Sequence, residues 1–182
     1  EDYFKIQPTY TSYQNKAQAF VAISNGCDKF CTYCIVPYSR GREKSRKIED
    51  ILAEAENLVA NDCKEITLLG QTVNSYGLGN HDKEHGTFAY LGEKEPFVFL
   101  LEELDKLYDI GLMRVRFTSP HPKDMSDQLI NAMATLRTHQ PYLHLPVQAG
   151  DDKVLRRMNR TYTTDQYRKI ITKLREKNPD IS

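Results

Sequence analysis

The chain has 182 residues with 25 lysines and arginines against 25 aspartates and glutamates, so any binding to nucleic acid or a membrane surface must come from a local patch. Hydrophobic residues make up 40% and aromatics 10%, as in a soluble globular domain, which excludes global disorder. No apolar run approaches the roughly 20 residues that span a bilayer, and the start lacks the apolar stretch of a secretory signal, so we expect a cytoplasmic protein.

The first third of the chain predicts one strand followed by one helix. Residues 1–16 are polar and rich in tyrosine, and we expect them to be a linker from a preceding, missing domain. Residues 19–24, AFVAIS, are typical of a short buried strand. Apolar side chains then recur at three- and four-residue spacing from Ile48 to Val59, which predicts a helix that begins near Ser45.

The same alternation continues to the end of the chain. We expect strands at residues 65–69, 114–119 and 143–148, and helices at 97–108, 126–136 and 164–177. Ser126 and Thr164 are the expected N-caps. The polar stretch 78–96 predicts a surface excursion, and the last residues, NPDIS, look like the approach to a fifth strand at which the domain is truncated.

Four successive strand–helix units predict an α/β fold with parallel strands joined by right-handed crossovers. The strands form either an open doubly wound sheet or an arc of a barrel. In both architectures the chemistry gathers at the carboxyl ends of the strands. The loops at that edge are the cysteine-containing loop, GQTVNSYG, SPHPKD and QAGDD. These four loops could therefore line one shared opening at the carboxyl ends of the strands.

Three of the four cysteines, Cys27, Cys31 and Cys34, lie within eight positions directly after the first strand. Tight cysteine spacing in a cytosolic protein points to metal or redox chemistry. Structural zinc normally takes four protein ligands, and the remaining cysteine, Cys63, lies at a strand entrance where a core thiol is expected. Three thiolates suit a 4Fe-4S cluster with one open iron, while a zinc site, simple thiol redox chemistry or small core residues are the alternatives.

The spacing Cys27-x3-Cys31-x2-Cys34 with Tyr33 before the last cysteine resembles the signature of radical SAM enzymes. Within that superfamily, residues 17–182 resemble methylthiotransferases, in the segments GCDKFCTYCIVPYSRGREKSR, LLGQTVNSYG, TSPHPKDMSDQLI and HLPVQAGDDKVLRRMNRTYT. The sequence after the second strand is most similar to the MiaB-type branch, whose members act on transfer RNA. The resemblance implies a partial (β/α) barrel of the radical SAM type.

The same resemblance implies that the three cysteines hold a 4Fe-4S cluster whose open iron binds S-adenosylmethionine. One electron from the cluster then splits the cofactor into methionine and a deoxyadenosyl radical. The implied reaction is methylthiolation of an isopentenylated adenosine beside the anticodon of tRNA. The alternative within the family is the RimO-type reaction on an aspartate of a ribosomal protein, and a non-enzymatic zinc or redox module is the alternative outside it.

Four further residues are candidates for binding S-adenosylmethionine. The family motif implies that Tyr33 packs near the adenine. Gly70 and Gln71 occupy the place of a Gly-Gly-Glu segment that contacts the cofactor's amino group in many relatives, although Leu69 precedes the glycine here. Gln148 is a polar candidate at the end of the fourth predicted strand, where it could instead be a turn residue.

The remaining polar motifs have structural explanations beside functional ones. The basic run from Arg40 to Lys47 is either a solvated segment or a contact for phosphate or cofactor carboxylate. We expect His121 and the arginines 156, 157 and 160 to shape loops, and His81 and His85 to be exposed and not to bind metal.

The family also implies further parts, which we expect to lie outside this chain. These are an amino-terminal domain with a second 4Fe-4S cluster that supplies sulfur, and a carboxyl-terminal TRAM domain that grips RNA. The expected partners are tRNA, largely through those missing domains, and an electron donor such as flavodoxin or ferredoxin. We expect the protein to be a monomer that does not contact a membrane. We also expect this fragment, taken alone, to be inactive.

Overall fold

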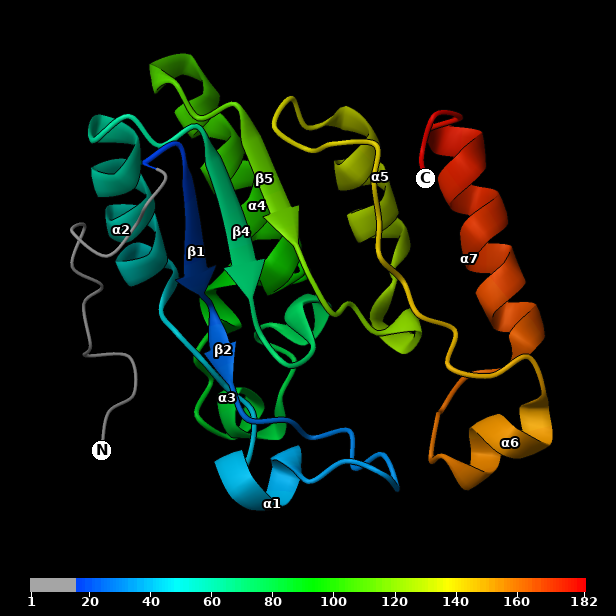
Figure 1. The fold of residues 1–182 in the computed structure, drawn as a ribbon. Helices are drawn as coiled ribbons and strands as arrows, with labels where there is room; N and C mark the ends of the chain where they lie inside the picture. The colour runs from blue at the N-terminus through cyan, green and yellow to red at the C-terminus, as the bar shows by residue number, and fades with distance from the viewer. Residues whose placement is uncertain (1–15) are drawn as a thin grey trace.

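The computed structural model describes residues 16–182, so the linker predicted for residues 1–16 lies outside it except for Lys16 (Figure 1). Its centre is a parallel sheet in the order β1 (Gln18–Ala22), β4 (Glu65–Leu69) and β5 (Arg114–Phe117). Residues 18 to 22 pair in register with 65 to 69, and 65 to 68 pair with 114 to 117. All three arrows in Figure 1 therefore point to one edge, where the predicted functional loops begin.

Helices and one small ribbon fill the connections between these strands. The ribbon is antiparallel and consists of β2 (Ser24–Asn25) and β3 (Lys44–Ser45). The α-helices are α1 (Val36–Arg40), α2 (Ile48–Ala60), α3 (Asn80–Glu84), α4 (Pro96–Asp105), α5 (Asp127–Thr135), α6 (Asp152–Arg157) and α7 (Thr164–Lys177). Short 3-10 helices are η3 (Val73–Ser75), η4 (Ala89–Leu91), η5 (Lys106–Ile110) and η6 (Pro122–Asp124).

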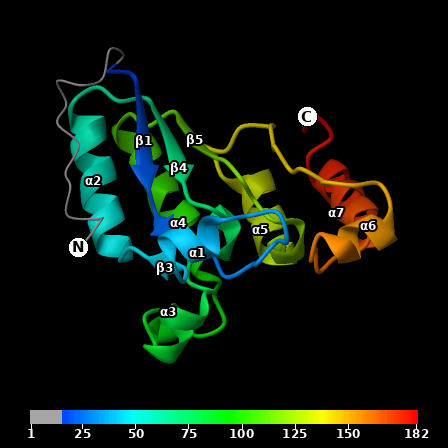
Figure 2. The same cartoon turned by 60° about the horizontal axis from the view of Figure 1, so that its bottom comes forward.

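The core lies between one face of the sheet and the helices α2 and α4, which Figures 1 and 2 show on the same side. Ile66 and Leu68 point to this face and are fully buried, together with Ile51 of α2 and Leu100 of α4. On the opposite face of β1, Phe20 is 57% exposed. The described residues thus form an arc with one covered face, which confirms the predicted α/β fold with parallel strands, and they do not close into a barrel.

The prediction of a fourth strand at residues 143–148 was wrong. In the structure this segment has no ladder to the described sheet. The chain meets β5 earlier, through an isolated parallel bridge between Val115 and His139. Pro146 explains part of the difference, because proline has no N–H to donate and is excluded from central strand positions. The fourth unit therefore lies beside the sheet as an extended connection.

Three helix starts test the predicted caps. Ser126 is the N-cap of α5, as predicted. The N-cap of α7 is Thr163, one residue before the predicted one, and it forms a capping box with Gln166. Helix α2 begins at Ile48, because Ser45 is already held in β3. None of the helices in residues 16–182 has the length and apolar character needed to cross a membrane.

The bridge residue His139 gives this fold a predicted pH dependence. Burial lowers the pKa of His139 to about 4, and its ring stacks on Phe117 with centroids 5.7 Å apart. An unfolded histidine has a pKa near 6.5, so the unfolded chain takes up the proton first and stability is lost as the pH falls from about 6.5 to about 4. We expect His139→Gln to flatten this loss in denaturant titrations over that range.

The control for this experiment is His144→Gln, which changes an exposed histidine. We expect the control to follow the wild-type profile. If both variants show the same pH profile as the wild type, His139 does not contribute the predicted dependence.

Candidate functional site

The cysteine loop starts from the β2/β3 ribbon, just beyond the carboxyl end of β1. Gly26 has a φ of +80°, and a Cβ at this position would lie 2.2 Å from the carbonyl oxygen of Arg42. Only glycine fits such a close approach. The N–H of Cys27 donates to the carbonyl of Gly41 at 3.2 Å. The first cysteine is therefore anchored through its backbone to the end of α1, on the segment that leads back to β3.

The three thiols of the loop are free and differ in exposure. Cys27 is buried, whereas Cys31 and Cys34 are half-buried. The N–H of Lys29 donates to the sulfur of Cys27 at 3.5 Å. Burial raises the pKa of the Cys27 thiol, and the N–H of Lys29 opposes this effect only partly. The loop thus presents one inner thiol and two outer thiols.

Asp28 ties the loop to the insert that follows β4. Its carboxylate accepts the N–H of Asn80 at 2.9 Å, the guanidinium of Arg42 at 2.9 Å and the N–H of Glu43 at 3.3 Å. Partial burial alone raises the pKa of Asp28, but these hydrogen bonds outweigh it and hold the pKa below its ordinary value. Asp28 therefore stays ionised and joins three segments of the chain.

A buried polar network lies behind Cys27. Glu43 is 1% exposed and accepts the hydroxyl of Thr72 at 3.2 Å. Burial raises the pKa of Glu43 to about 7, although the charge of Lys29 and the Thr72 hydrogen bond oppose the rise. Lys29 pairs with Asp124, which also accepts the hydroxyl of Ser75 at 2.6 Å. The network joins the cysteine loop to the loops after β4 and β5.

A reciprocal pair of hydrogen bonds connects the loops after β4 and β5. The amide of Asn74 donates to the carbonyl of His121 at 2.9 Å and accepts the N–H of His121 at 2.7 Å. Burial, followed by the charges of Lys29 and Arg160, lowers the pKa of His121 to about 4. The side chain of His121 accepts the N–H of Lys123 at 3.2 Å. These contacts agree with the predicted loop-shaping role of His121.

Of the four other predicted site residues, Tyr33 lies in the cysteine loop, Gly70 and Gln71 directly follow β4, and Gln148 lies in the extended connection beside the sheet. Tyr33 is 54% exposed, and its hydroxyl accepts the guanidinium of Arg160 at 2.7 Å. A Cβ at Gly70 would lie 2.6 Å from the hydroxyl oxygen of Ser24, so β4 and β2 approach closely there. Gln71 is half-buried in the turn after β4, and Gln148 is exposed with a φ of +68°.

Comparison with known proteins shows to which superfamily a chain with this site belongs. The profile of the Radical SAM superfamily matches residues 21–181. This chain belongs to the radical SAM superfamily. It is 54% identical over 166 residues to a tRNA-2-methylthio-N(6)-dimethylallyladenosine synthase of Thermoanaerobacter sp., covering 91% of this chain and 32% of the relative. It is 46% identical over 182 residues to the protein of the same name from Paracoccus denitrificans, covering 100% of this chain and 38% of the relative. The chain thus spans about a third of the length of these relatives.

Solved structures support the radical SAM fold at low sequence identity. The methyltransferase TsrM from Kitasatospora setae, with a SAM analog bound, aligns with a TM-score of 0.63 and 15% identity over 89% of this chain and 29% of its own. The cobalamin-dependent radical enzyme OxsB aligns with a TM-score of 0.63 and 10% identity over 87% of this chain and 22% of its own. At these identities the likeness concerns the fold alone.

Enzymes of this superfamily use a 4Fe-4S cluster and S-adenosylmethionine, and a second TsrM structure holds a [4Fe-4S] cluster. The donor set of the loop fits such a cluster, because it consists of three free thiols on one short segment. In residues 16–182, no three side chains of His, Cys, Asp or Glu are arranged to hold a metal ion. A cluster does not need that convergence, since each thiolate binds a different iron.

The remaining sequence motifs lie apart from the thiols or have structural partners. Cys63 is buried two residues before β4, and its sulfur donates to the carbonyl of Glu65 at 3.3 Å, which confirms the predicted core thiol. His85 is exposed, as predicted, but His81 is half-buried and stacks on it with centroids 4.3 Å apart. Arg46 binds the carbonyl of Ala22 at 2.8 Å, so this part of the basic run stabilises the fold.

Glu43, Lys29 and Asp124 lie in or beside the cysteine loop, and sequence reasoning did not select them. Each is a charged residue in a polar stretch, and nothing in the local pattern distinguishes it from an exposed charge. Glu43 is buried and the other two are half-buried because of contacts between three separate loops. The one available signal was their position after strand ends, where functional side chains gather.

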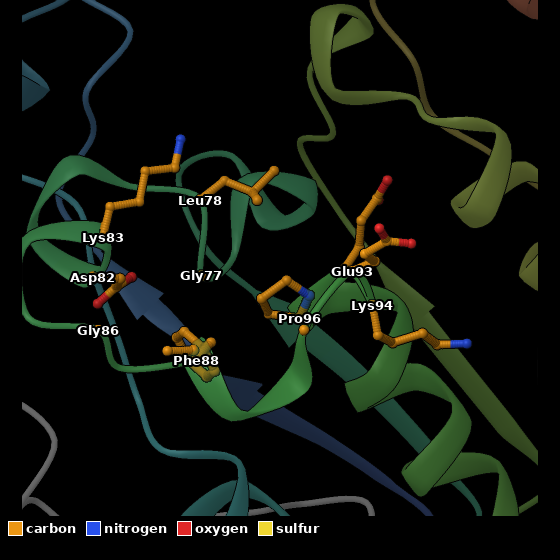
Figure 3. A pocket seen from close by; sticks show the side chains of 12 residues that line it. Gly77, Leu78, Asp82, Lys83, Gly86, Phe88, Glu93, Lys94 and Pro96 are labelled. Carbon is orange, nitrogen blue, oxygen red and sulfur yellow. The ribbon is translucent and has the colours of Figure 1, made fainter.

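A separate pocket of about 340 Å³ lies in the insert between Gly77 and Pro96 (Figure 3). The insert was predicted as a surface excursion, and it contains α3 and η4. Lys83 and Lys94 lie on opposite sides of the pocket in Figure 3 and do not converge. Asp82 lines it, but the Oδ2 atom has no accessible surface and no partner among the described residues. Since the pocket lining contains no cysteine, it is distinct from the cysteine loop.

The entry to the cysteine loop gives a prediction on stability. We expect Gly26→Ala to lower the free energy of unfolding by more than Gly41→Ala, because the new methyl group collides with the backbone of Arg42. Gly41 has a φ of +76° but open space around it, so its substitution costs only the conformational strain of about 1–3 kcal/mol. Denaturant titration of the two variants measures the difference.

Gly150→Ala serves as the neutral control, because Gly150 has open space and an ordinary φ. We expect its effect to stay within about 0.5 kcal/mol. Equal losses for Gly26→Ala and Gly41→Ala would show that the close approach at Arg42 is unimportant.

Proposed function

We propose that this chain is the radical SAM core of a methylthiotransferase that modifies an isopentenylated adenosine beside the anticodon of tRNA. The support is the identity of about half to relatives named tRNA-2-methylthio-N(6)-dimethylallyladenosine synthase, over nearly the whole chain. The chain covers only about a third of those relatives, so the complete reaction belongs to a longer protein.

Cys27, Cys31 and Cys34 are the proposed ligands of the 4Fe-4S cluster. The observation that carries this assignment is the three free thiols in one loop at the carboxyl edge of a parallel sheet. The structure offers no nearby fourth cysteine, because Cys63 lies at the opposite end of β4. Three protein ligands leave one iron of the cluster open for S-adenosylmethionine.

When bound, the reduced cluster supplies the electron that splits S-adenosylmethionine and begins the radical chemistry. The residues of this chain hold the ligands in place. Gly26 and Gly41 fix the backbone of Cys27, and Asp28 binds the loop to Arg42 and to the insert. The division of work follows the usual pattern, in which the cofactor performs the hard chemistry and the fold orients it.

Tyr33, Gly70, Gln71 and Gln148 remain the proposed contacts for S-adenosylmethionine. Tyr33 is supported by its exposed ring next to two cysteines. Gly70 rests on its position directly after β4, and the close approach to the hydroxyl of Ser24 gives a packing reason for the glycine as well. Gln71 rests on its position directly after β4, and Gln148 on its position in the loop before α6.

The proposed partners are tRNA, bound largely through domains beyond this chain, and a flavodoxin or ferredoxin as electron donor. A second 4Fe-4S cluster in a preceding domain is the proposed source of sulfur. We further propose that the protein is cytoplasmic and monomeric.

Iron analysis tests the ligand assignment. After anaerobic reconstitution of the full-length protein, we expect the triple variant C27A/C31A/C34A to bind about four irons fewer than the wild type, since one cluster is lost. Cys63→Ala should leave the iron content unchanged, because its thiol lies in the core. A triple variant with wild-type iron content, or a colourless wild-type protein that binds zinc, would refute the assignment.

A substrate comparison tests the reaction. The reconstituted full-length protein is incubated with S-adenosylmethionine, a reductant and either tRNA that carries isopentenyladenosine or the ribosomal protein that RimO-type enzymes modify. We expect the mass increase of a methylthio group on the tRNA only. Modification of the ribosomal protein instead would assign this chain to the other branch.

A further inference from the structure

The cysteine loop is held on its outer side by the last residue of α6 and the three residues after it, residues 157–160. Figure 1 shows the loop between β2 and α1 extending toward α6, although more than a hundred residues separate them in sequence. The N–H of Thr32 donates to the carbonyl of Met158 at 3.3 Å, and its hydroxyl donates to the carbonyl of Arg157 at 3.0 Å. The fourth strand–helix unit therefore contacts the loop through its backbone.

Asn159 makes the central contact of this segment. Its side-chain amide donates to the carbonyl of Phe30 at 2.8 Å, with the carbonyl of Lys29 at 3.5 Å. Phe30 has a φ of +46°, a conformation that is costly for a bulky residue. The ring of Phe30 is 45% exposed, so burial of the side chain supports this conformation only in part. The amide of Asn159 thus supports the strained turn from outside the loop, beside the contact of the Phe30 ring with Tyr38 at 6.1 Å between centroids.

The loop residues that contact residues 157–160 lie on both sides of Cys31 in the sequence. Lys29 and Phe30 precede it, and Thr32 and Tyr33 follow it. Tyr33 is held by the guanidinium of Arg160, which also lies over its ring at 5.8 Å. In contrast, Cys27 is anchored from the inner side by Gly41 and Lys29. The inner and outer thiols are supported by different parts of the chain.

We propose that Asn159 is a positioning residue for Cys31, which sets the second ligand of the cluster before iron binds. This inference rests on the proposed function, because it concerns the same ligand set. Loop residues lose conformational freedom when they bind a metal group, and contacts that order the loop beforehand reduce this cost. The fourth unit thereby contributes to a site whose ligands all come from the first.

A purely local role for Asn159 can be separated from this one. Asn159 has a φ of +56° just after α6, and its N–H donates to the carbonyl of Arg156, as at many helix ends. Glycine adopts the left-handed conformation at least as easily as asparagine. Asn159→Gly therefore keeps the helix end and removes only the amide that reaches the loop.

The test uses the full-length protein, reconstituted anaerobically. We expect Asn159→Gly to fold as the wild type but to lose iron to a chelator about two- to fivefold faster, the effect of one partly exposed hydrogen bond. The electron paramagnetic resonance signal of the reduced cluster should change as well. Thr32→Val should behave in the same way, whereas Thr32→Ser keeps the hydroxyl and should match the wild type.

Asn61→Gly is the matched control, because Asn61 also ends a helix and its amide bonds only within that helix, to Asn57. We expect wild-type iron loss and an unchanged signal for this control. If Asn159→Gly and Thr32→Val both behave as the wild type while the iron content still depends on the three cysteines, the inference is overturned. The proposed function then still stands. Iron content independent of the three cysteines overturns both.

Discussion

The parallel register of β1, β4 and β5 is the constraint on which the site depends. Hydrogen bonds pair residues 18 to 22 with 65 to 69, and 65 to 68 with 114 to 117, so the three strands end together. Each connection must then begin at the same edge of the sheet, whatever its length or composition. The burial of Ile66 and Leu68 against α2 and α4 holds this register, because a shift by one residue would turn them to the open face.

The cysteine loop is polar, and it needs contacts from outside itself to adopt one shape. On the inner side the β2/β3 ribbon, Gly26 and Asp28 anchor its first residues. On the outer side residues 157–160 hold the segment around Cys31. Each ordered residue costs conformational entropy, so support from two sides is the physical condition for a defined set of thiols.

The charges behind the loop form a connected network because a single buried charge is costly. Lys29 pairs with Asp124, which also accepts a hydroxyl from Ser75, while Glu43 accepts one from Thr72. Desolvation raises the pKa of Glu43, against the opposing charge of Lys29 and the hydrogen bond from Thr72. A network of this kind makes the relative placement of the three loops specific, since moving one loop leaves a buried polar group without a partner.

The sequence by itself determined the parallel α/β fold, the position of the cysteines after the first strand and the core role of Cys63. These features follow from hydrophobic periodicity and cysteine spacing, and both can be read within a short stretch of sequence. The tertiary structure decided that residues 143–148 do not join the sheet, that Glu43 is buried and that Asn159 holds the carbonyl of Phe30. Such features depend on contacts between residues far apart in the chain, and the local pattern around each of them is that of an ordinary polar loop or strand.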